Sequence, residues 1–191
     1  MYTVSTKILS FEEWQSLPET EQACEVMDGV LIMSPGASDD HQWVELEIAF
    51  RLSTFVKENR LGVVLTAPRD VLVQREPLRV RQPDILFISA EKSGVTSRPG
   101  PGRPIPLEIA PDLIVEIISP SNTESEMNEK LDDYRNIGVL EAWLARPESG
   151  TIEVIPMNQQ ETDTHVTFGP GEILRSSVLT ELAVPVSEIF E

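Results

Sequence analysis

Two spacings of hydrophobic residues recur along the chain, and each is typical of one kind of element. Residues 112–119 (DLIVEIIS) are a run of branched apolar side chains, which predicts a strand buried on both faces. Residues 41–59 instead place apolar side chains at positions 44, 48, 52, 55 and 56, the spacing of one helix face. Glu116 interrupts the first run. Because a buried carboxylate without a partner is strongly destabilising, Glu116 must be neutralised, paired or bound to a cation.

Shorter apolar runs predict further strands. Residues 24–35 hold an Asp-Gly pair between two apolar stretches, which is a strong signal of a β-hairpin. The other runs are separated by proline, glycine or charged residues and cover residues 62–68, 69–74, 83–89, 139–145 and 151–157. We expect the first three of these strands to form the middle of a sheet.

Capping residues predict two more helices. Ser10, followed by acidic residues, predicts a short helix that Pro18 ends. Residues 122–138 (NTESEMNEKLDDYRNIG) predict a longer helix that ends at its final glycine. Residues 91–111 are rich in glycine and proline, so we expect a long surface loop without regular structure there.

The size and composition of the chain are those of an ordinary globular domain. With 191 residues, 40% of them apolar and 25% charged, we expect one domain over residues 1–191. No apolar run approaches the roughly 18 to 20 residues that span a bilayer, and the N-terminus lacks a signal-peptide pattern. We therefore expect a cytoplasmic protein with no membrane contact. Cys24 is the only cysteine, which excludes an intramolecular disulfide and a multi-cysteine zinc site.

The charge of the chain is strongly acidic but unevenly distributed. It has 15 basic and 32 acidic residues, a net charge of −17, which argues against loose electrostatic binding to nucleic acid. Residues 60–103 contain eight basic and four acidic residues, a local excess of +4 that leaves −21 for the rest. This segment is compatible with a polyanionic ligand and equally with a scatter of solvated arginines.

Two predicted strands each carry one carboxylate. Asp84 follows a proline at the start of PDILFIS, and Glu116 lies inside DLIVEIIS. If these strands are neighbours, the two carboxylates converge and repel each other unless a hard divalent cation lies between them. Oxygen ligands of this kind suit Mg²⁺ or Mn²⁺. The alternative is that Glu116 pairs with an arginine while Asp84 is an exposed turn residue.

Here the chain resembles the PD-(D/E)XK nuclease superfamily, whose hallmark is an Asp on one strand and Glu-x-Lys on the next. More narrowly, it is similar to the bacterial Uma2 family of restriction-endonuclease-like proteins. The segments that carry this resemblance are CEVMDGVLIMSPGASDDHQ, QPDILFIS, PDLIVEIISPSN, EKLDDYRNIGVLEAWL and GEILRSSVLTELAVPVSEIF. The resemblance implies an α/β (α+β) fold with a restriction-endonuclease-like core, in which helices flank a central mixed β-sheet.

The chain departs from the superfamily pattern at one position. The third residue of Glu-x-Lys is Ile118, which can neither orient a water nor stabilise an anion. The resemblance gives this role to Lys130 on the following helix. The alternative is that Lys130 is an ordinary solvated surface lysine. The resemblance also adds Glu25 and His41 as auxiliary pocket residues. His41 could hold a phosphate or a water, and Glu25 could be a ligand or a partner of one, although both residues also have ordinary structural explanations.

The function implied by the resemblance is that of an endonuclease that uses Mg²⁺ or Mn²⁺ to hydrolyse DNA phosphodiester bonds. Asp84 and Glu116 would bind the metal, Lys130 would complete the catalytic set, and the products would be a 5′-phosphate and a 3′-hydroxyl. The +4 segment would face the DNA phosphate backbone, and the acidic remainder would weaken this contact enough to call for a partner protein. The sequence does not determine whether the protein forms a homodimer. It also leaves two other functions open: a binding or regulatory module that has lost catalysis, and a metal-dependent hydrolase of another phosphodiester.

Overall fold

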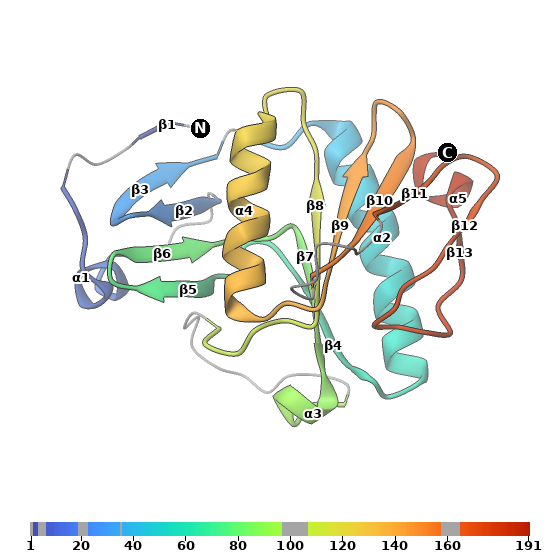
Figure 1. Cartoon of the computed structure of the whole chain (residues 1–191), viewed down its shortest axis with the longest axis horizontal. Helices are drawn as coiled ribbons and strands as arrows, with labels where there is room; N and C mark the ends of the chain where they lie inside the picture. The colour runs from blue at the N-terminus through green and yellow to red at the C-terminus, as the bar shows by residue number, and fades with distance from the viewer. Residues whose placement is uncertain (1, 4–6, 19–22, 35, 97–106, 158–164) are drawn as a thin grey trace.

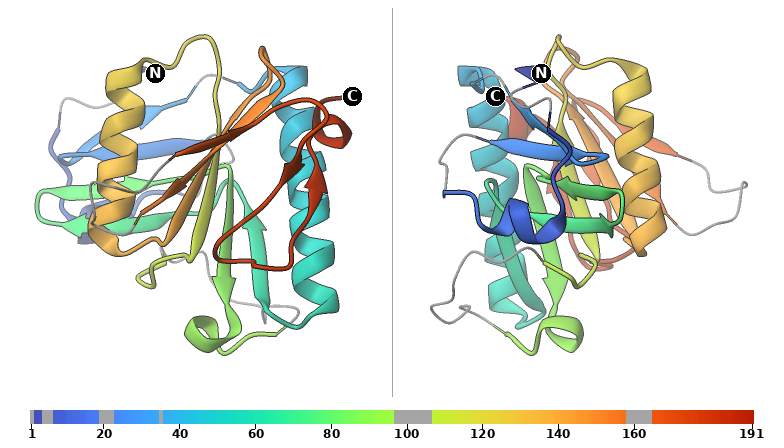
Figure 2. Two further views of the ribbon diagram at one scale, coloured as in Figure 1. Left: turned by 45° about the vertical axis from the view of Figure 1, so that its right-hand side comes forward. Right: turned by 90° about the vertical axis from the view of Figure 1, so that its left-hand side faces the viewer.

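The central element of the fold is a six-stranded mixed sheet with one long helix on each face (Figures 1 and 2). The computed structural model describes residues 2–3, 7–18, 23–34, 36–96, 107–157 and 165–191. The strand order is β11-β10-β9-β8-β7-β4, and β8 and β9 run parallel while the other neighbours are antiparallel. Its strands are β4 (Gly62–Thr66), β7 (Ile85–Ser89), β8 (Leu113–Ile117), β9 (Glu141–Arg146), β10 (Thr151–Pro156) and β11 (Val166–Phe168). The predicted α/β fold with a central mixed sheet flanked by helices is confirmed.

A second sheet packs beside the first, on the left in Figure 1, in the order β1-β3-β2-β6-β5. Its strands are β1 (Tyr2–Thr3), β2 (Cys24–Met27), β3 (Val30–Met33), β5 (Val71–Arg75) and β6 (Leu78–Arg81). The predicted hairpin is present as β2 and β3. Asp28 and Gly29 between them both have positive φ, as the two-residue hairpin turn requires.

The prediction that residues 62–68, 69–74 and 83–89 form the middle of one sheet is wrong. β5 is the edge strand of the smaller sheet, where it pairs with β6, and β4 is an edge strand of the larger sheet. Of the three predicted strands, only β7 is therefore internal to the larger sheet. β6 was not predicted, because its sequence LRVR alternates apolar residues with arginines over only four positions. Strands that follow each other in sequence need not pair, and here the short break before Val71 separates two sheets.

The two long helices cover opposite faces of the larger sheet, as both views in Figure 2 show. α2 spans Asp39–Glu58 and begins two residues before the predicted helix, because the Ser38 side chain caps it by accepting from the backbone N–H of His41. α4 spans Glu124–Ile137, is capped by Thr123, and ends at Gly138 in the left-handed conformation, as predicted. Among the described residues, no helix is both long enough and apolar enough to cross a lipid bilayer.

The remaining elements are short. The helix predicted after Ser10 is present as α1 (Phe11–Gln15). The predicted loop 91–111 begins inside a helical turn, α3 (Ala90–Ser93), and its part from residue 97 to residue 106 lies outside the described residues. Near the C-terminus, β12 (Ile173–Leu174) pairs with β13 (Val184–Pro185), and α5 spans Ser187–Phe190.

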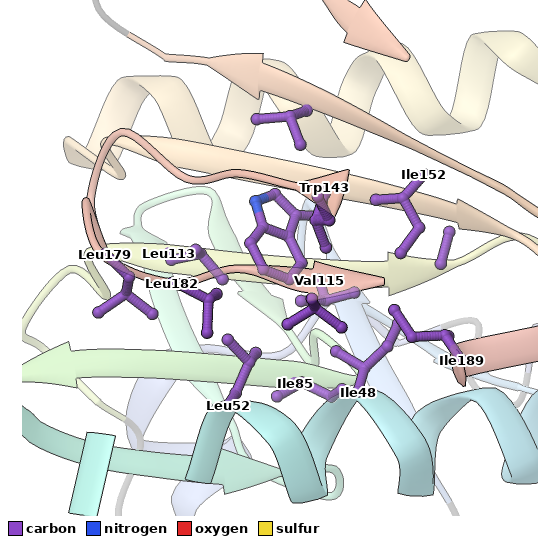
Figure 3. Packing of buried hydrophobic residues seen from close by; sticks show 14 of the residues in the cluster. Ile48, Leu52, Ile85, Leu113, Val115, Trp143, Ile152, Leu179, Leu182 and Ile189 are labelled. Atoms are coloured by element: carbon purple, nitrogen blue, oxygen red, sulfur yellow. The ribbon is translucent and has the colours of Figure 1, made fainter. Parts of the chain in front are cut away.

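Alternation along the strands divides the core of the larger sheet into two layers. One layer packs against α2 and contains Ile85, Val115 and Trp143 together with Ile48 and Leu52 of the helix (Figure 3). The other layer packs against α4, and its members include Leu86 and Ile114 from the strands and Met127, Leu131 and Tyr134 from the helix. Residues of even number in β7 and β8 therefore face α4.

A buried carboxylate that the sequence did not single out anchors the C-terminal segment to the larger sheet. Oε1 of Glu141, at the start of β9, accepts hydrogen bonds from Trp143 Nε1 at 2.8 Å and Ser176 Oγ at 2.6 Å. Its Oε2 accepts from the backbone N–H and the hydroxyl of Ser177 at 2.7 and 2.6 Å. Four donors from two distant segments thus depend on one side chain.

We expect Glu141→Ala to lower the free energy of unfolding by about 3 kcal/mol, because buried donors lose their acceptor. Urea unfolding followed by circular dichroism measures this change. Glu153→Ala on the neighbouring strand β10 is the matched control, since its carboxylate forms only partly exposed ion pairs. That variant should lose less than about 1 kcal/mol. Equal losses in the two variants would contradict the anchoring role of Glu141.

Candidate active site

Asp84 lies just before β7, and Glu116 lies in the neighbouring strand β8. β7 and β8 are antiparallel, with Ile85 opposite Val115 and Leu86 opposite Ile114. One further step in this register brings Asp84, just before β7, opposite Glu116. Both side chains line the same cleft, and the charge of Asp84 acts on Glu116, so the two carboxylates lie near each other. Glu116 contacts α4, whereas Asp84 contacts His41 of α2.

Glu116 is paired by two residues of α4. Its side chain is buried, and its Oε2 lies 2.8 Å from Nζ of Lys130 while its Oε1 accepts a 2.5 Å hydrogen bond from the Tyr134 hydroxyl. Lys130 and Tyr134 are four residues apart and therefore share one face of the helix. The buried carboxylate is thus satisfied by a lysine and a tyrosine, not by an arginine.

The ammonium of Lys130 belongs to a buried series of alternating charges, which we call the charge chain: Glu116, Lys130, Glu25, Arg81 and Asp133. Nζ of Lys130 lies 3.0 Å from Oε1 of Glu25. Oε2 of Glu25 accepts a 2.9 Å hydrogen bond from Arg81, and Nε of Arg81 donates to Asp133 at 2.8 Å. All five side chains are buried. The charge chain connects β8 and α4 to β2 and β6 of the smaller sheet.

Burial and pairing set the protonation states in the charge chain. Burial raises the pKa of Glu116 to about 7, and the nearby carboxylates of Asp84 and Glu25 act in the same direction against the attraction of Lys130. Burial disfavours the ammonium of Lys130, but Glu116 and Glu25 outweigh this effect and raise its pKa above the usual value. Lys130 therefore stays protonated at neutral pH, so it can donate hydrogen bonds and stabilise negative charge but cannot act as a base.

Asp84 is positioned by the backbone and by α2. Its Oδ2 accepts a 2.6 Å hydrogen bond from the backbone N–H of Ile117 and lies 3.5 Å from Nε2 of His41. The hydrogen bond with Asp84 raises the pKa of His41 although burial opposes it. Nδ1 of His41 is buried and has no hydrogen-bond partner in the part of the chain that the structure describes. His41 thus adjoins the carboxylate pair with one ring nitrogen unused.

These residues line a cleft of about 1420 Å³ between the N-terminal ends of α2 and α4. Its described lining is acidic, with carboxylates from six residues: Glu25, Asp39, Glu45, Asp84, Glu116 and Glu126. The basic side chains among these lining residues are His41 and the buried Lys130. Burial, together with the charge of Asp84, raises the pKa of Glu45. The cleft therefore favours a cation over an anion.

The cleft offers carboxylate oxygens, which are the type of donor that Mg²⁺ takes. Within the described residues, no group of three or more His, Cys, Asp or Glu side chains is arranged to hold a metal. Mg²⁺ is commonly held by one or two carboxylates, with waters and substrate phosphates as its other ligands, whereas Zn²⁺ takes four protein ligands in structural sites and three in catalytic ones. Asp84 and Glu116 would supply two such carboxylates, with Glu116 exchanging a contact to Lys130 or Tyr134 for the ion. Both oxygens of Glu25 are engaged by Lys130 and Arg81, so Glu25 is placed to hold the lysine.

The basic excess in residues 60–103 is largely neutralised by ion pairs. Four of its eight basic residues pair with carboxylates: Arg75, Arg79, Arg81 and Lys92. Two others, Arg98 and Arg103, lie outside the described residues. The segment therefore does not form a broad basic surface over the residues that the structure describes.

Three members of the site were missed by the sequence analysis: Arg81, Asp133 and Tyr134. Tyr134 could have been found, because it lies four residues after Lys130 on the same predicted helix face. Arg81 gave no local signal, since it lies in the strand that was not predicted and meets Asp133 across 52 residues of sequence. His165 is outside the cleft and exposed, with Nδ1 3.0 Å from Glu153.

Comparisons with known proteins agree with this fold. No curated protein matches the chain. A crystal structure from Anabaena variabilis, described as "a putative nuclease belonging to DUF820", superposes with a TM-score of 0.76 at 22% identity, covering 95% of this chain and 97% of that one, which shows a shared fold. The sequence model of the Uma2 family, described as "Putative restriction endonuclease", matches residues 11–187. This match includes every residue of the charge chain together with Asp84 and His41, and the chain belongs to the Uma2 family.

Proposed function

We propose that the protein is a divalent-metal-dependent endonuclease that hydrolyses phosphodiester bonds of DNA. The observation that supports the proposal is that Asp84 and Glu116 line one cleft, with a protonated lysine 2.8 Å from Glu116. All three lie in a cleft that is open to a substrate. Membership of a family described as restriction endonucleases supports this assignment.

Each residue of the site has a role that follows from its surroundings. Asp84 and Glu116 would hold Mg²⁺ or Mn²⁺ through their carboxylate oxygens. When bound, the ion would polarise the phosphate and lower the pKa of a water. Lys130, which stays protonated, would stabilise the negative charge that develops on the phosphate. Glu25 holds this ammonium, and His41 would orient Asp84, whose Oδ2 lies 3.5 Å from its Nε2.

Lys130→Met is expected to lower the rate of DNA cleavage by about 10²- to 10³-fold, the usual effect of losing one donor that stabilises transition-state charge. The methionine keeps most of the length of the side chain and removes the charge. Initial rates on labelled DNA with Mg²⁺ measure the effect, and EDTA should abolish cleavage by the unaltered protein.

Lys57→Met is the matched control for this assay, because Lys57 is exposed near the end of α2 and outside the cleft. It should cleave at the rate of the unaltered protein. If the unaltered protein, Lys57→Met and Lys130→Met all cleave equally, the activity belongs to a contaminating nuclease and the proposal is lost. Circular dichroism of each variant separates lost chemistry from lost folding.

A second candidate function is binding without cleavage on the same fold. Two observations favour it: Ile118 occupies the position of the superfamily lysine, and the Glu116 carboxylate already has the ammonium of Lys130 as a partner. This candidate predicts that DNA is bound but remains intact with every metal tested. Including RNA and a simple phosphodiester in the same assay tests for a metal-dependent hydrolase of another substrate.

A further inference from the structure

The outer face of α2 carries three large hydrophobic side chains that are exposed. Trp43 is 50% exposed, and Leu46 and Phe50 are each 62% exposed. Their spacing of three and four residues puts them on one side of the helix, away from the residues that pack on the sheet. Trp43 and Leu46 also line the cleft that contains Asp84, whereas Phe50 does not. An exposed apolar stripe that continues into a cleft marks a binding surface.

The charges in the cleft restrict how it can bind a nucleic acid. Proteins that bind through the backbone neutralise phosphates with lysine and arginine. Of the described lining residues, Lys130 is the one lysine or arginine, and it is buried between two carboxylates. Phosphate contacts can therefore supply little of the affinity in this cleft, and contacts to the bases must supply more of it.

The size of the cleft is also informative. Its volume of about 1420 Å³ exceeds the roughly 300 to 1,000 Å³ of pockets that hold one small molecule. There is room for a nucleotide beside the carboxylate pair and for a base of the adjoining nucleotide. Trp43 and Leu46 supply an apolar surface of the cleft against which the flat face of such a base can pack.

We propose that Trp43, supported by Leu46, stacks on an unpaired base of the substrate, so that the preferred substrate is a single-stranded or locally unpaired nucleic acid. This inference rests on the proposed nuclease function and specifies its substrate. Bases inside a duplex are already stacked on their neighbours and expose only their edges, so a tryptophan at the cleft can stack only on a base that has left the helix.

The test measures binding apart from cleavage. All variants are made in an Asp84→Asn background, which is expected to be unable to cleave, and binding to a short fluorescent oligonucleotide is followed by anisotropy in Mg²⁺. Single-stranded binding should exceed duplex binding of the same sequence by about tenfold or more. Trp43→Ala should weaken single-stranded binding about 10- to 100-fold, and Trp43→Phe should stay within about threefold of the parent.

Two controls make the result specific. Phe50→Ala removes an equally exposed side chain from the same helix face outside the cleft, and it should leave binding unchanged. An oligonucleotide with abasic residues keeps the phosphates and removes the bases. The parent should bind it about as weakly as Trp43→Ala binds the intact oligonucleotide, and Trp43→Ala should show no further loss.

The inference is overturned if Trp43→Ala binds as tightly as the parent, if duplex is preferred, or if no oligonucleotide binds. It is also overturned if sedimentation shows that Trp43→Ala and Phe50→Ala both dissociate a dimer while binding is unaffected, since the stripe would then join two copies of the chain. The proposed function fails separately. Base-dependent binding through Trp43 without metal-dependent cleavage by the unaltered protein would leave the inference standing and remove the nuclease, and efficient duplex cleavage by Trp43→Ala would do the reverse.

Discussion

Replacing Asp84 with asparagine is expected to reduce metal-dependent cleavage by about 10³-fold or more. Asp84 is one of two carboxylates proposed to hold the cation, and a bound metal contributes several kcal/mol to charge stabilisation, with each 1.36 kcal/mol worth a factor of ten in rate. Asparagine preserves the shape of the side chain and an oxygen that can still accept from the backbone N–H of Ile117. The loss should therefore reflect charge and not folding.

Two measurements support this test. Calorimetric titration with Mn²⁺ in the absence of DNA should show binding that is at least about tenfold weaker in Asp84→Asn. Asp132→Asn is the matched control, because Asp132 is exposed on α4 and pairs with Arg135 at a distance from the cleft. It should change neither metal binding nor cleavage. Normal Mn²⁺ binding and normal cleavage by Asp84→Asn would show that Asp84 is not a ligand.

The largest effect on stability is expected for Arg81→Met. Arg81 is buried and connects Glu25 to Asp133, so its loss breaks two buried ion pairs. Each carboxylate is left with one cation, Lys130 for Glu25 and Arg79 for Asp133. Removing one partner of a buried ion pair usually costs about 3 to 5 kcal/mol, and we expect the free energy of unfolding to fall by that amount. Urea unfolding measures the change.

Arg135→Met is the matched control for Arg81→Met, since it breaks an exposed ion pair within α4 and should cost less than about 1 kcal/mol. A double variant adds a sharper criterion. Because Glu25 and Arg81 are in direct contact, Glu25→Gln combined with Arg81→Met should cost clearly less than the sum of the two single changes. Additive losses, or a small loss for Arg81→Met alone, would mean that the charge chain does not act as a unit.

The elements that the sequence predicted well are those whose pattern is contained in one segment. The apolar face of α2, the glycine that ends α4 and the Asp-Gly hairpin each depend on residues close together in sequence. The assignment of strands to sheets failed at β5 and β6, because pairing depends on partners far away in sequence. β6 pairs with β2, for example, through Val80 and Val26.

The site divides in the same way. Asp84, Glu116 and Lys130 could be named from motifs, and the structure brings Lys130 to Glu116 across fourteen residues. Arg81 and Asp133 could not be named, since nothing near either residue in sequence indicates that β6 of the smaller sheet meets α4 there. The sequence also could not tell which group neutralises Glu116, because a lysine, an arginine and a metal all satisfy the same electrostatic requirement.

The charge chain has a consequence for how this protein can change over evolutionary time. Arg81 and Glu25 belong to the smaller sheet, yet they fix where the ammonium of Lys130 stands beside Glu116 on the larger one. A substitution that merely reorients the outlying hairpins would shift that ammonium without altering any residue of the cleft. Under the proposed nuclease function, the rate of cleavage would therefore be open to adjustment by mutations outside the cleft. Relatives with identical cleft residues would then be expected to differ in rate.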